Sequence, residues 1–264
     1  MDTTKPVHYS KNSCHQYSIG VEVLQRYMKW EEGDTVLDAG CGTGATCKYI
    51  SQQPGVASVV GFDVSPDFIS YASQHNSSPN ILYHVADVSD VSTFKPEWQG
   101  AFSKAVSFFV LHWVRDKTAA LKALHHCLKP RGEIVMCSTF DKSKILQTFA
   151  KMVAHPKWKI YLQHPVLLFP WPSSDVTNRV LMEECGFEVL SCQLKAAPEP
   201  FESKEKLKEF LGAIFPLLSY IPQNKRDEFL DDMEKMARET HVLSGLAGDY
   251  KVTEEYQVVQ ARKL

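Results

Sequence analysis

A glycine-rich turn directly after a short apolar run limits most strongly how this chain can fold. Residues 36–44 read VLDAGCGTG, so Gly40, Gly42 and Gly44 follow a run typical of a buried strand. Glycine lets the backbone turn sharply and approach a ligand, because no Cβ stands in the way. The amides that open the next helix can then face a polar or anionic group. The pattern therefore predicts a strand, a ligand-binding turn and a helix.

Two acidic residues accompany the turn. A second short apolar run, residues 57–62, ends in Asp63, which lies nineteen residues after Gly44. An acid at the tip of the second strand of a βαβ unit is placed to bind ribose hydroxyls. The first strand also carries an acid, Asp38, and the glycine spacing is G-x-G-x-G rather than G-x-G-x-x-G. A carboxylate at this position suits a cationic ammonium and would repel a diphosphate.

In these respects residues 36–44 resemble the first motif of class I S-adenosylmethionine-dependent methyltransferases. In that family the loop surrounds the methionine part of the cofactor. The resemblance implies S-adenosyl-L-methionine as cofactor and an α/β fold, with a Rossmann-like, mostly parallel sheet, an antiparallel last strand and helical lid insertions. The residues expected to bind the cofactor are Asp38, Gly40, Gly42, Gly44, Asp63, Val64, Asp87, Val88 and Phe108.

The bulk composition narrows the class of protein further. With 264 residues, 44% of them hydrophobic, the chain can bury one large core. The formal net charge of −2 and the pI of about 6.6 do not indicate a nucleic-acid partner. We find no apolar window long enough to span a membrane and no signal-peptide core. The seven scattered cysteines lack zinc spacing, so we expect reduced thiols, no metal site and a cytoplasmic protein.

Strand and helix patterns alternate through the first half of the chain, as expected for a parallel sheet with helices on both faces. We expect a single domain over residues 1–264, with a helical cap at 1–30 and a cofactor-binding core at 33–140. Lid insertions are expected at 141–176 and 195–248. The expected strands are 35–39, 57–62, 81–85, 104–110, 133–139, 187–194 and 251–261, and the expected helices are 44–52, 66–75, 116–128 and 175–185, with further helices within 201–242.

Hydrogen-bond donors near the expected site suggest the acceptor. Trp113 follows the fourth strand, where its indole N–H is a donor only. Gln16, seven residues after Tyr9 in the N-terminal helix, supplies an amide. A carboxylate is already ionised at neutral pH, so a carboxyl methyltransferase needs donors that hold the acceptor and no obligatory base.

With these residues the chain is similar to the insect juvenile hormone acid O-methyltransferases over almost its whole length. The resemblance implies that Gln16 and Trp113 hydrogen-bond the substrate carboxylate and carry the catalysis. It also implies that Asp38 and Gly40 bind the methionine part of the cofactor, Asp63 the ribose, and that Asp87 lies near the adenine amine. The implied acceptors are sesquiterpenoid acids such as juvenile hormone acid and farnesoic acid. The segments that carry the resemblance are Tyr9 with Gln16, 36–44, 61–65, 71–73, 107–114, 128–130, 215–218, 221–222, 228–232 and 261–263.

Other interpretations remain open at this point. The acceptor could be another small molecule, such as a phenol, an amine or a dicarboxylate, in place of a small apolar carboxylic acid. The chain could also be a cofactor-binding protein without activity. His112 is either a general base or a buried structural histidine. The sequence does not distinguish a monomer from a homodimer.

Overall fold

The structure is a computed structural model that describes residues 6–12, 14–163, 168–215, 217–244 and 250–264. Its main sheet has the strand order β3-β2-β1-β4-β5-β8-β6, and β7 pairs with β8. The strands are β1 (Asp34–Ala39), β2 (Val56–Asp63), β3 (Ile81–Val85), β4 (Phe102–Phe108), β5 (Leu128–Ser138), β6 (Phe187–Phe201), β7 (Leu243–Ser244) and β8 (Tyr250–Lys263). The α-helices are α1 (Pro6–Asn12), α2 (Cys14–Tyr27), α3 (Ala45–Ser51), α4 (Pro66–His75), α5 (Lys117–Cys127), α6 (Lys144–Ala154), α7 (Asp175–Glu184), α8 (Lys204–Ile214) and α9 (Arg226–Glu239).

The first five strands are parallel to one another, and β8 runs antiparallel to both of its neighbours, β5 and β6. This confirms the predicted sheet. Neighbouring residues of β1 face opposite sides: Leu37 packs in one core cluster with α5 and α7, and Val36 packs in another with α2 and α3. Both sides of the sheet are therefore covered, as continuous apolar strands require.

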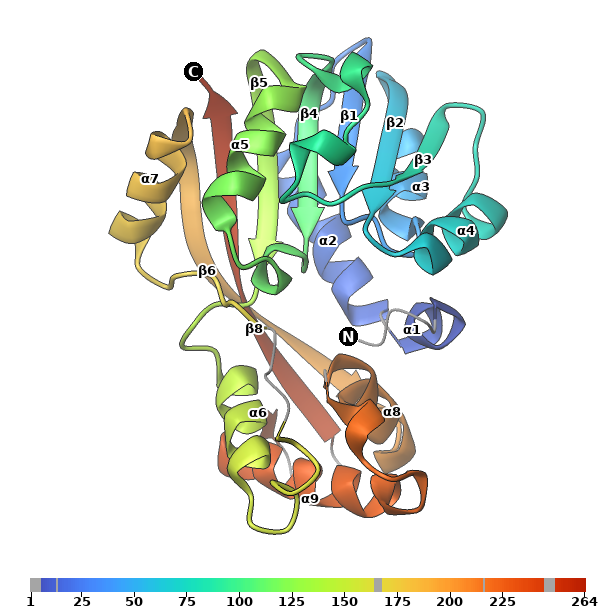
Figure 1. Ribbon diagram of the computed structural model, residues 1–264, viewed down its shortest axis with the longest axis vertical. Coiled ribbons are helices and arrows are strands. Elements are labelled where there is room, and N and C mark those ends of the chain that lie inside the picture. Colours follow the sequence, from blue (N-terminus) through green and yellow to red (C-terminus); the bar gives the residue numbers. More distant parts are fainter. Residues whose placement is uncertain (1–5, 13, 164–167, 216, 245–249) are drawn as a thin grey trace.

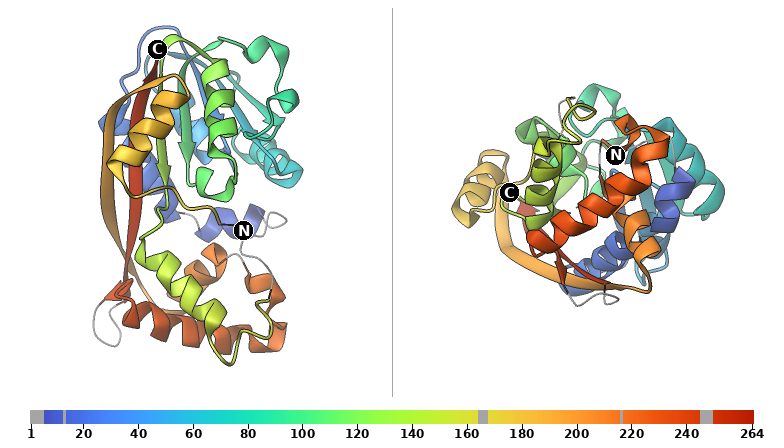
Figure 2. Two further views of the ribbon diagram at one scale, coloured as in Figure 1. Left: turned by 60° about the vertical axis from the view of Figure 1, so that its left-hand side comes forward. Right: turned by 90° about the horizontal axis from the view of Figure 1, so that it is seen from below.

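A third hydrophobic cluster lies away from the main sheet. It joins α6, α8 and α9 to β7 and the first part of β8, with Trp158 and Phe229 among its fully buried members. Figure 1 shows these helices at the far end of the long strands β6 and β8. In Figure 2 the N-terminal helices lie between this group and the main sheet. We call the three helices α6, α8 and α9 the lid.

Several elements differ from their expected bounds, most clearly the N-terminal helix, β5 (expected at 133–139) and β6. The N-terminal helix is divided into α1 and α2. Strand β6 continues past 194 to Phe201, through Pro198 and Pro200. Both prolines lie on an edge strand that, among the described strands, pairs with β8 alone, so a missing N–H is tolerated there. The helical region 201–242 contains α8 and α9, separated by short 3₁₀ turns around Pro222.

Candidate active site

The site lies at the carboxyl ends of β1 and β4, where the strand order reverses, which is where open α/β sheets bind ligands. Here the turn after β1 is held against β2, because the amides of Gly40 and Cys41 both donate to the carbonyl of Phe62 at 2.8 and 2.9 Å. After β4, Phe109 takes a left-handed φ of 57°. Such a conformation is strained for a bulky residue and is found most often at functional sites. The turn and Phe109 border the same cavity.

Asp38 is the charged group of this first cavity, which contains about 500 Å³ of empty space, part of it open to solvent. The side chain is only 2% exposed, and its one recorded hydrogen bond within the described chain comes from the thiol of Cys47 at 3.1 Å. Burial raises the pKa of Asp38 to about 7. A buried carboxylate without a cation nearby fits a ligand that brings its own ammonium, as the methionine part of S-adenosylmethionine does.

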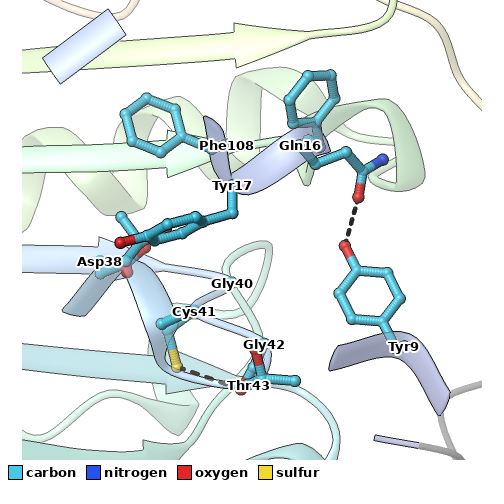
Figure 3. Close-up of a pocket in the computed structure, with 12 residues that line it drawn as sticks. Tyr9, Gln16, Tyr17, Asp38, Gly40, Cys41, Gly42, Thr43 and Phe108 are labelled. Carbon is cyan, nitrogen blue, oxygen red and sulfur yellow. Dashed lines mark hydrogen bonds between the residues drawn. The ribbon is translucent and has the colours of Figure 1, made fainter. Parts of the chain in front are cut away.

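The glycines of the turn are required by its geometry. Gly40 has a φ of +77°, and a Cβ added there would lie 2.3 Å from Cγ2 of Val110. At Gly44, with a φ of +81°, a Cβ would lie 2.5 Å from the hydroxyl oxygen of Tyr83. Figure 3 shows the turn passing beneath Tyr17 and Phe108, which line the same cavity. At Gly40 and Gly44 the backbone can therefore approach a ligand, because no Cβ projects from it there.

Asp63 supports the turn from the end of β2. Its two carboxylate oxygens accept the amides of Gly42 at 3.0 Å and Ser65 at 2.9 Å. Burial raises its pKa even though these amide hydrogen bonds act in the opposite direction. The carboxylate thus fixes the position of Gly42, and its contact with the ribose stays a prediction.

The other residues predicted to bind the cofactor lie in different environments. Phe108 lines the first cavity. Asp87 accepts both the amide and the hydroxyl of Ser89, at 2.8 and 2.7 Å, in a turn after β3. Val88 is buried in the core cluster that contains Trp98, whereas Val64 is 61% exposed. Asp87, Val88 and Val64 do not border this first cavity, and their contacts with the cofactor stay predictions.

A second cavity adjoins the first and shares Tyr9, Gln16 and Phe109 with it. It contains about 550 Å³ of empty space, again partly open to solvent. Both predicted catalytic residues, Gln16 and Trp113, line this cavity, although 97 positions separate them along the chain. The side of the cavity formed by the lid and its flanking segment is apolar, with Ile145, Leu146, Phe149, Leu168, Ala213 and Ile214.

The amide of Gln16 is oriented by Tyr9. The Tyr9 hydroxyl donates to Oε1 of Gln16 at 2.6 Å. Figure 3 shows that the amide nitrogen consequently points away from Tyr9. Burial raises the pKa of Tyr9 well above its usual range, so this hydroxyl keeps its proton. The nitrogen of Gln16 is thereby left to donate to a ligand.

Trp113 and His112 lie in a 3₁₀ turn, Leu111–Trp113, just after β4. His112 is buried, and its Nδ1 lies 3.2 Å from the Ser138 hydroxyl and 3.4 Å from the Thr139 amide. Burial, reinforced by the charge of Lys117, lowers the pKa of His112 to about 3. His112 is therefore neutral at physiological pH, but it also lines the second cavity, so both interpretations of its role stay open.

Lys117 holds this turn in place, and the sequence analysis missed it. Its ammonium donates to the carbonyls of Leu111 at 3.2 Å and Val114 at 3.1 Å, on either side of Trp113, and to the carbonyl of Phe169. The Phe169 amide in turn donates to the His112 carbonyl at 2.7 Å. No local pattern reveals such a role, because the third acceptor, Phe169, lies 52 positions away and only the fold brings it close to Lys117. Tyr17 and Glu254, which line the first and second cavities, were missed for the same reason.

A comparison with known proteins decides the class. Residues 36–132 match the family model described as a methyltransferase domain. The chain contains a methyltransferase domain and has the class I methyltransferase fold. The predicted fold and the predicted cofactor, S-adenosylmethionine, are thereby confirmed. Within the described residues no helix is long and apolar enough to cross a membrane, and no group of three potential ligands is placed to hold a metal.

The predicted resemblance to the juvenile hormone acid O-methyltransferases is also confirmed. The methyltransferase is 25% identical to the enzyme of that name from Bombyx mori, over 97% of this chain and 96% of the other. It is 23% identical to the one from Drosophila melanogaster, over 96% and 89%. Among solved structures, a putative methyltransferase from Bacillus halodurans superposes with a TM-score of 0.64 at 15% identity, covering 93% of this chain and 99% of the other. That last likeness concerns the fold alone.

Proposed function

We propose that this methyltransferase transfers the methyl group of S-adenosylmethionine to the carboxylate of a small apolar acid and forms the methyl ester. The observation that carries the proposal is the second cavity, in which the Gln16 amide and the Trp113 side chain share a space with an apolar wall. The cavity adjoins the Asp38 pocket, with which it shares Tyr9, Gln16 and Phe109. A sesquiterpenoid acid, such as juvenile hormone acid or farnesoic acid, has the two features that such a cavity would bind, a carboxylate and a long apolar chain.

Methyl transfer to a carboxylate requires the protein mainly to bind the two reactants and to align them. Bound S-adenosylmethionine supplies a methyl group on a cationic sulfonium. An acid acceptor is ionised at neutral pH, so no group has to remove a proton from it. Gln16 and Trp113 would hold the carboxylate by charge-assisted hydrogen bonds and aim one oxygen at the first cavity. Such positioning can lower a barrier by several kcal/mol, on the order of the gains from intramolecular alignment.

The lid would determine which acids fit. Its apolar residues Ile145, Leu146, Phe149 and Ile214 come from α6 and α8, and Leu168 precedes Phe169, the residue bound by Lys117. A long hydrocarbon chain would bury its apolar surface here, which contributes about 25 cal/mol per Å². The same wall would offer a short or polar acid little affinity.

One observation favours a second candidate acceptor. The carboxyl group of Glu254 also lines the second cavity. An amine or a phenol must lose a proton on methylation, and an anionic Glu254 could accept it. The two candidates require opposite protonation states of Glu254. An amine or a phenol needs the ionised form, whereas an ionised glutamate would repel an acid substrate.

The first test is methyl transfer from labelled S-adenosylmethionine to a panel containing farnesoic acid, short acids, aromatic acids, amines and phenols. Labelled methyl farnesoate is expected to dominate. Labelling of other acids alone would remove the terpenoid chain from the proposal, and labelling of amines or phenols alone would replace it with the second candidate.

Variants test the roles of the two donors. Gln16→Leu and Trp113→Phe should each lower kcat/KM for the acid about 10- to 100-fold, because each loses a hydrogen bond to a charged group worth about 1.5–3 kcal/mol. Cofactor affinity should not change. Gln25→Leu is the matched control, since Gln25 lies on the same helix and contacts only the Tyr49 hydroxyl among the recorded bonds of the described chain. Equal activity in all three variants would rule out a carboxylate clamp.

The proposed compartment is the cytoplasm. Every cysteine whose side chain is described is free, and five of these six are buried. Free thiols are typical of proteins kept in a reducing environment. A homodimer remains an alternative to a monomer, which the mass of the purified protein in solution would decide.

A further inference from the structure

A buried histidine lies between two glutamates next to the proposed carboxylate clamp. His15 precedes Gln16 in α2, and it is 5% exposed. Its Nδ1 lies 3.0 Å from Oε2 of Glu199 on β6, and its Nε2 lies 3.4 Å from Oε2 of Glu254 on β8. Glu254 is 8% exposed and lines the second cavity together with Gln16 and Trp113. The proposed function gives this group no role.

The geometry leaves room for one proton. Glu199 is the closer and more exposed carboxylate, so its Oε2 accepts the Nδ1–H of His15. In a neutral imidazole the other nitrogen, Nε2, then carries a lone pair. This lone pair faces Oε2 of Glu254, and neither atom has a hydrogen-bond partner within the described chain. Two facing acceptors are satisfied when a proton lies between them.

Burial favours the neutral form of both His15 and Glu254. It lowers the pKa of His15 and raises the pKa of Glu254 to about 7, with the charge of Glu199 adding to the second effect. Both shifts favour a neutral pair in which Glu254 keeps its proton and donates it to Nε2. Among the described residues, the charge of Glu254 also raises the pKa of Tyr9 on α1, Cys137 on β5 and Tyr256 on β8, none of which is cationic, and the neutral His112 lines the same cavity.

We infer that Glu254 and His15 together hold one proton beside the acceptor cavity, and that this proton is required for an acid to bind there. With the proton in place the pair carries no net charge, and a carboxylate can enter. When the proton leaves to solvent, the O–H bond of Glu254 breaks and a second negative charge stays in the wall of the cavity. Two carboxylates that share a site of low polarity repel each other strongly. The inference rests on the proposed function, because it concerns an acid acceptor.

Binding measurements over a range of pH test the inference. The dissociation constant of farnesoic acid would be measured by titration calorimetry on the complex with S-adenosylhomocysteine, between pH 6 and 9. For the wild type we expect affinity to fall towards tenfold per pH unit once the pair loses its proton. In Glu254→Gln the amide still donates to His15 but cannot ionise, so affinity should be nearly independent of pH. Glu255→Gln is the matched control: Glu255 bonds to Lys144 instead, so this variant should keep the wild-type dependence.

A second measurement needs no variant. Above the pKa of the pair, binding of the acid should take up about one proton, which titrations in two buffers of different ionisation enthalpy would show. Binding of methyl farnesoate, which is uncharged, should take up none. A binding enthalpy for the acid that does not depend on the buffer, or a Glu254→Gln variant with the wild-type pH dependence, would overturn the inference.

The two proposals fail in different ways. If the acid binds and is methylated but without proton uptake, the proton inference is wrong and the proposed function stands. If no acid binds to the wild type or to Glu254→Gln at any pH, the proposed function is wrong and the inference fails with it. If Glu254→Gln loses methyl transfer to amines or phenols that the wild type methylates, Glu254 acts as a base and both are overturned.

Discussion

The two cavities of this methyltransferase are built in different ways. The first is formed mainly by one short stretch, residues 38–46, backed by Phe108 and Phe109 at the end of β4. The second is assembled from α1, α2, the 3₁₀ turn at Leu111–Trp113, α6, α8 and β8. The first cavity depends on backbone conformation within a buried sheet. The second depends on side-chain contacts between segments that lie far apart in the sequence.

This difference indicates how each cavity should respond to amino-acid substitutions. A turn fixed by backbone geometry tolerates almost no substitution, and an error there affects the cofactor and the fold together. A cavity held by separate polar contacts should lose function in steps, one contact at a time, with the cofactor unaffected. The polar contacts that join the parts of the second cavity include Tyr9 with Gln16, His15 with its two glutamates, and Lys117 with three carbonyls.

The largest effect is expected at Gly40. Replacement by alanine forces a Cβ into the left-handed conformation and places it 2.3 Å from Cγ2 of Val110. Strain and overpacking together should weaken S-adenosylmethionine binding by at least about 2 kcal/mol, measured by calorimetry. Adding Val110→Ala should recover part of the loss, because it removes the overlap but not the strain.

Gly33 provides the matched control. It also has a left-handed φ, of +83°, but nothing lies within 4 Å of an added Cβ. Gly33→Ala should lower the melting temperature slightly and leave cofactor affinity unchanged. If Gly40→Ala bound the cofactor as well as Gly33→Ala does, the first cavity would not depend on its backbone geometry.

The second-largest effect is expected in how S-adenosylmethionine binding depends on pH through Asp38. Burial raises its pKa to about 7, so below that pH the ligand-free protein holds Asp38 protonated. The ammonium of S-adenosylmethionine selects the ionised form, and binding must then release a proton. The dissociation constant should therefore rise about tenfold for each pH unit below 7 and level off above it. Asp38→Asn should bind weakly at pH 8 and show no such slope. The same slope in both proteins would assign it to another group.

The same contrast explains what could be predicted from the sequence. The turn, its glycines and Asp38 lie within nine consecutive residues, and their pattern has a direct physical meaning. The alternation of strands and helices predicted the sheet because each period reflects local burial. Strand β6 was predicted too short because its prolines at 198 and 200 are typical of loops, and only the sheet reveals that they lie on an edge.

The second cavity could be predicted only in part. Gln16 and Trp113 were singled out as hydrogen-bond donors near the expected site, but only the family resemblance assigned both to one carboxylate. Lys117 and Glu254 carried no signal, since their meaning comes from Phe169 and His15, which lie 52 and 239 positions away. Long-range packing decides which polar groups meet, and a single sequence does not record it.

The third-largest effect is expected at Lys117, and it tests whether the turn that carries Trp113 depends on this residue. Lys117→Met removes the three hydrogen bonds to backbone carbonyls but keeps most of the volume of the side chain. We expect kcat/KM for the acid to fall about tenfold, corresponding to about 1.4 kcal/mol, with cofactor affinity unchanged. Lys122→Met, an exposed substitution on the same helix, should change neither quantity. A loss of cofactor affinity in Lys117→Met would mean that the two cavities are not independent.

The smallest effect is expected at Tyr9, which orients the Gln16 amide without itself being needed as a donor to the acid. Tyr9→Phe removes the 2.6 Å hydrogen bond and should lower kcat/KM by about 1 kcal/mol, or roughly fivefold. In a Gln16→Leu background the same change should have almost no effect, because there is no amide left to orient. Such a double-mutant cycle separates an indirect role from a direct one, since independent contributions would add. Additive losses would show that Tyr9 contacts the acid itself, and the second cavity would then have a third donor at its boundary with the first.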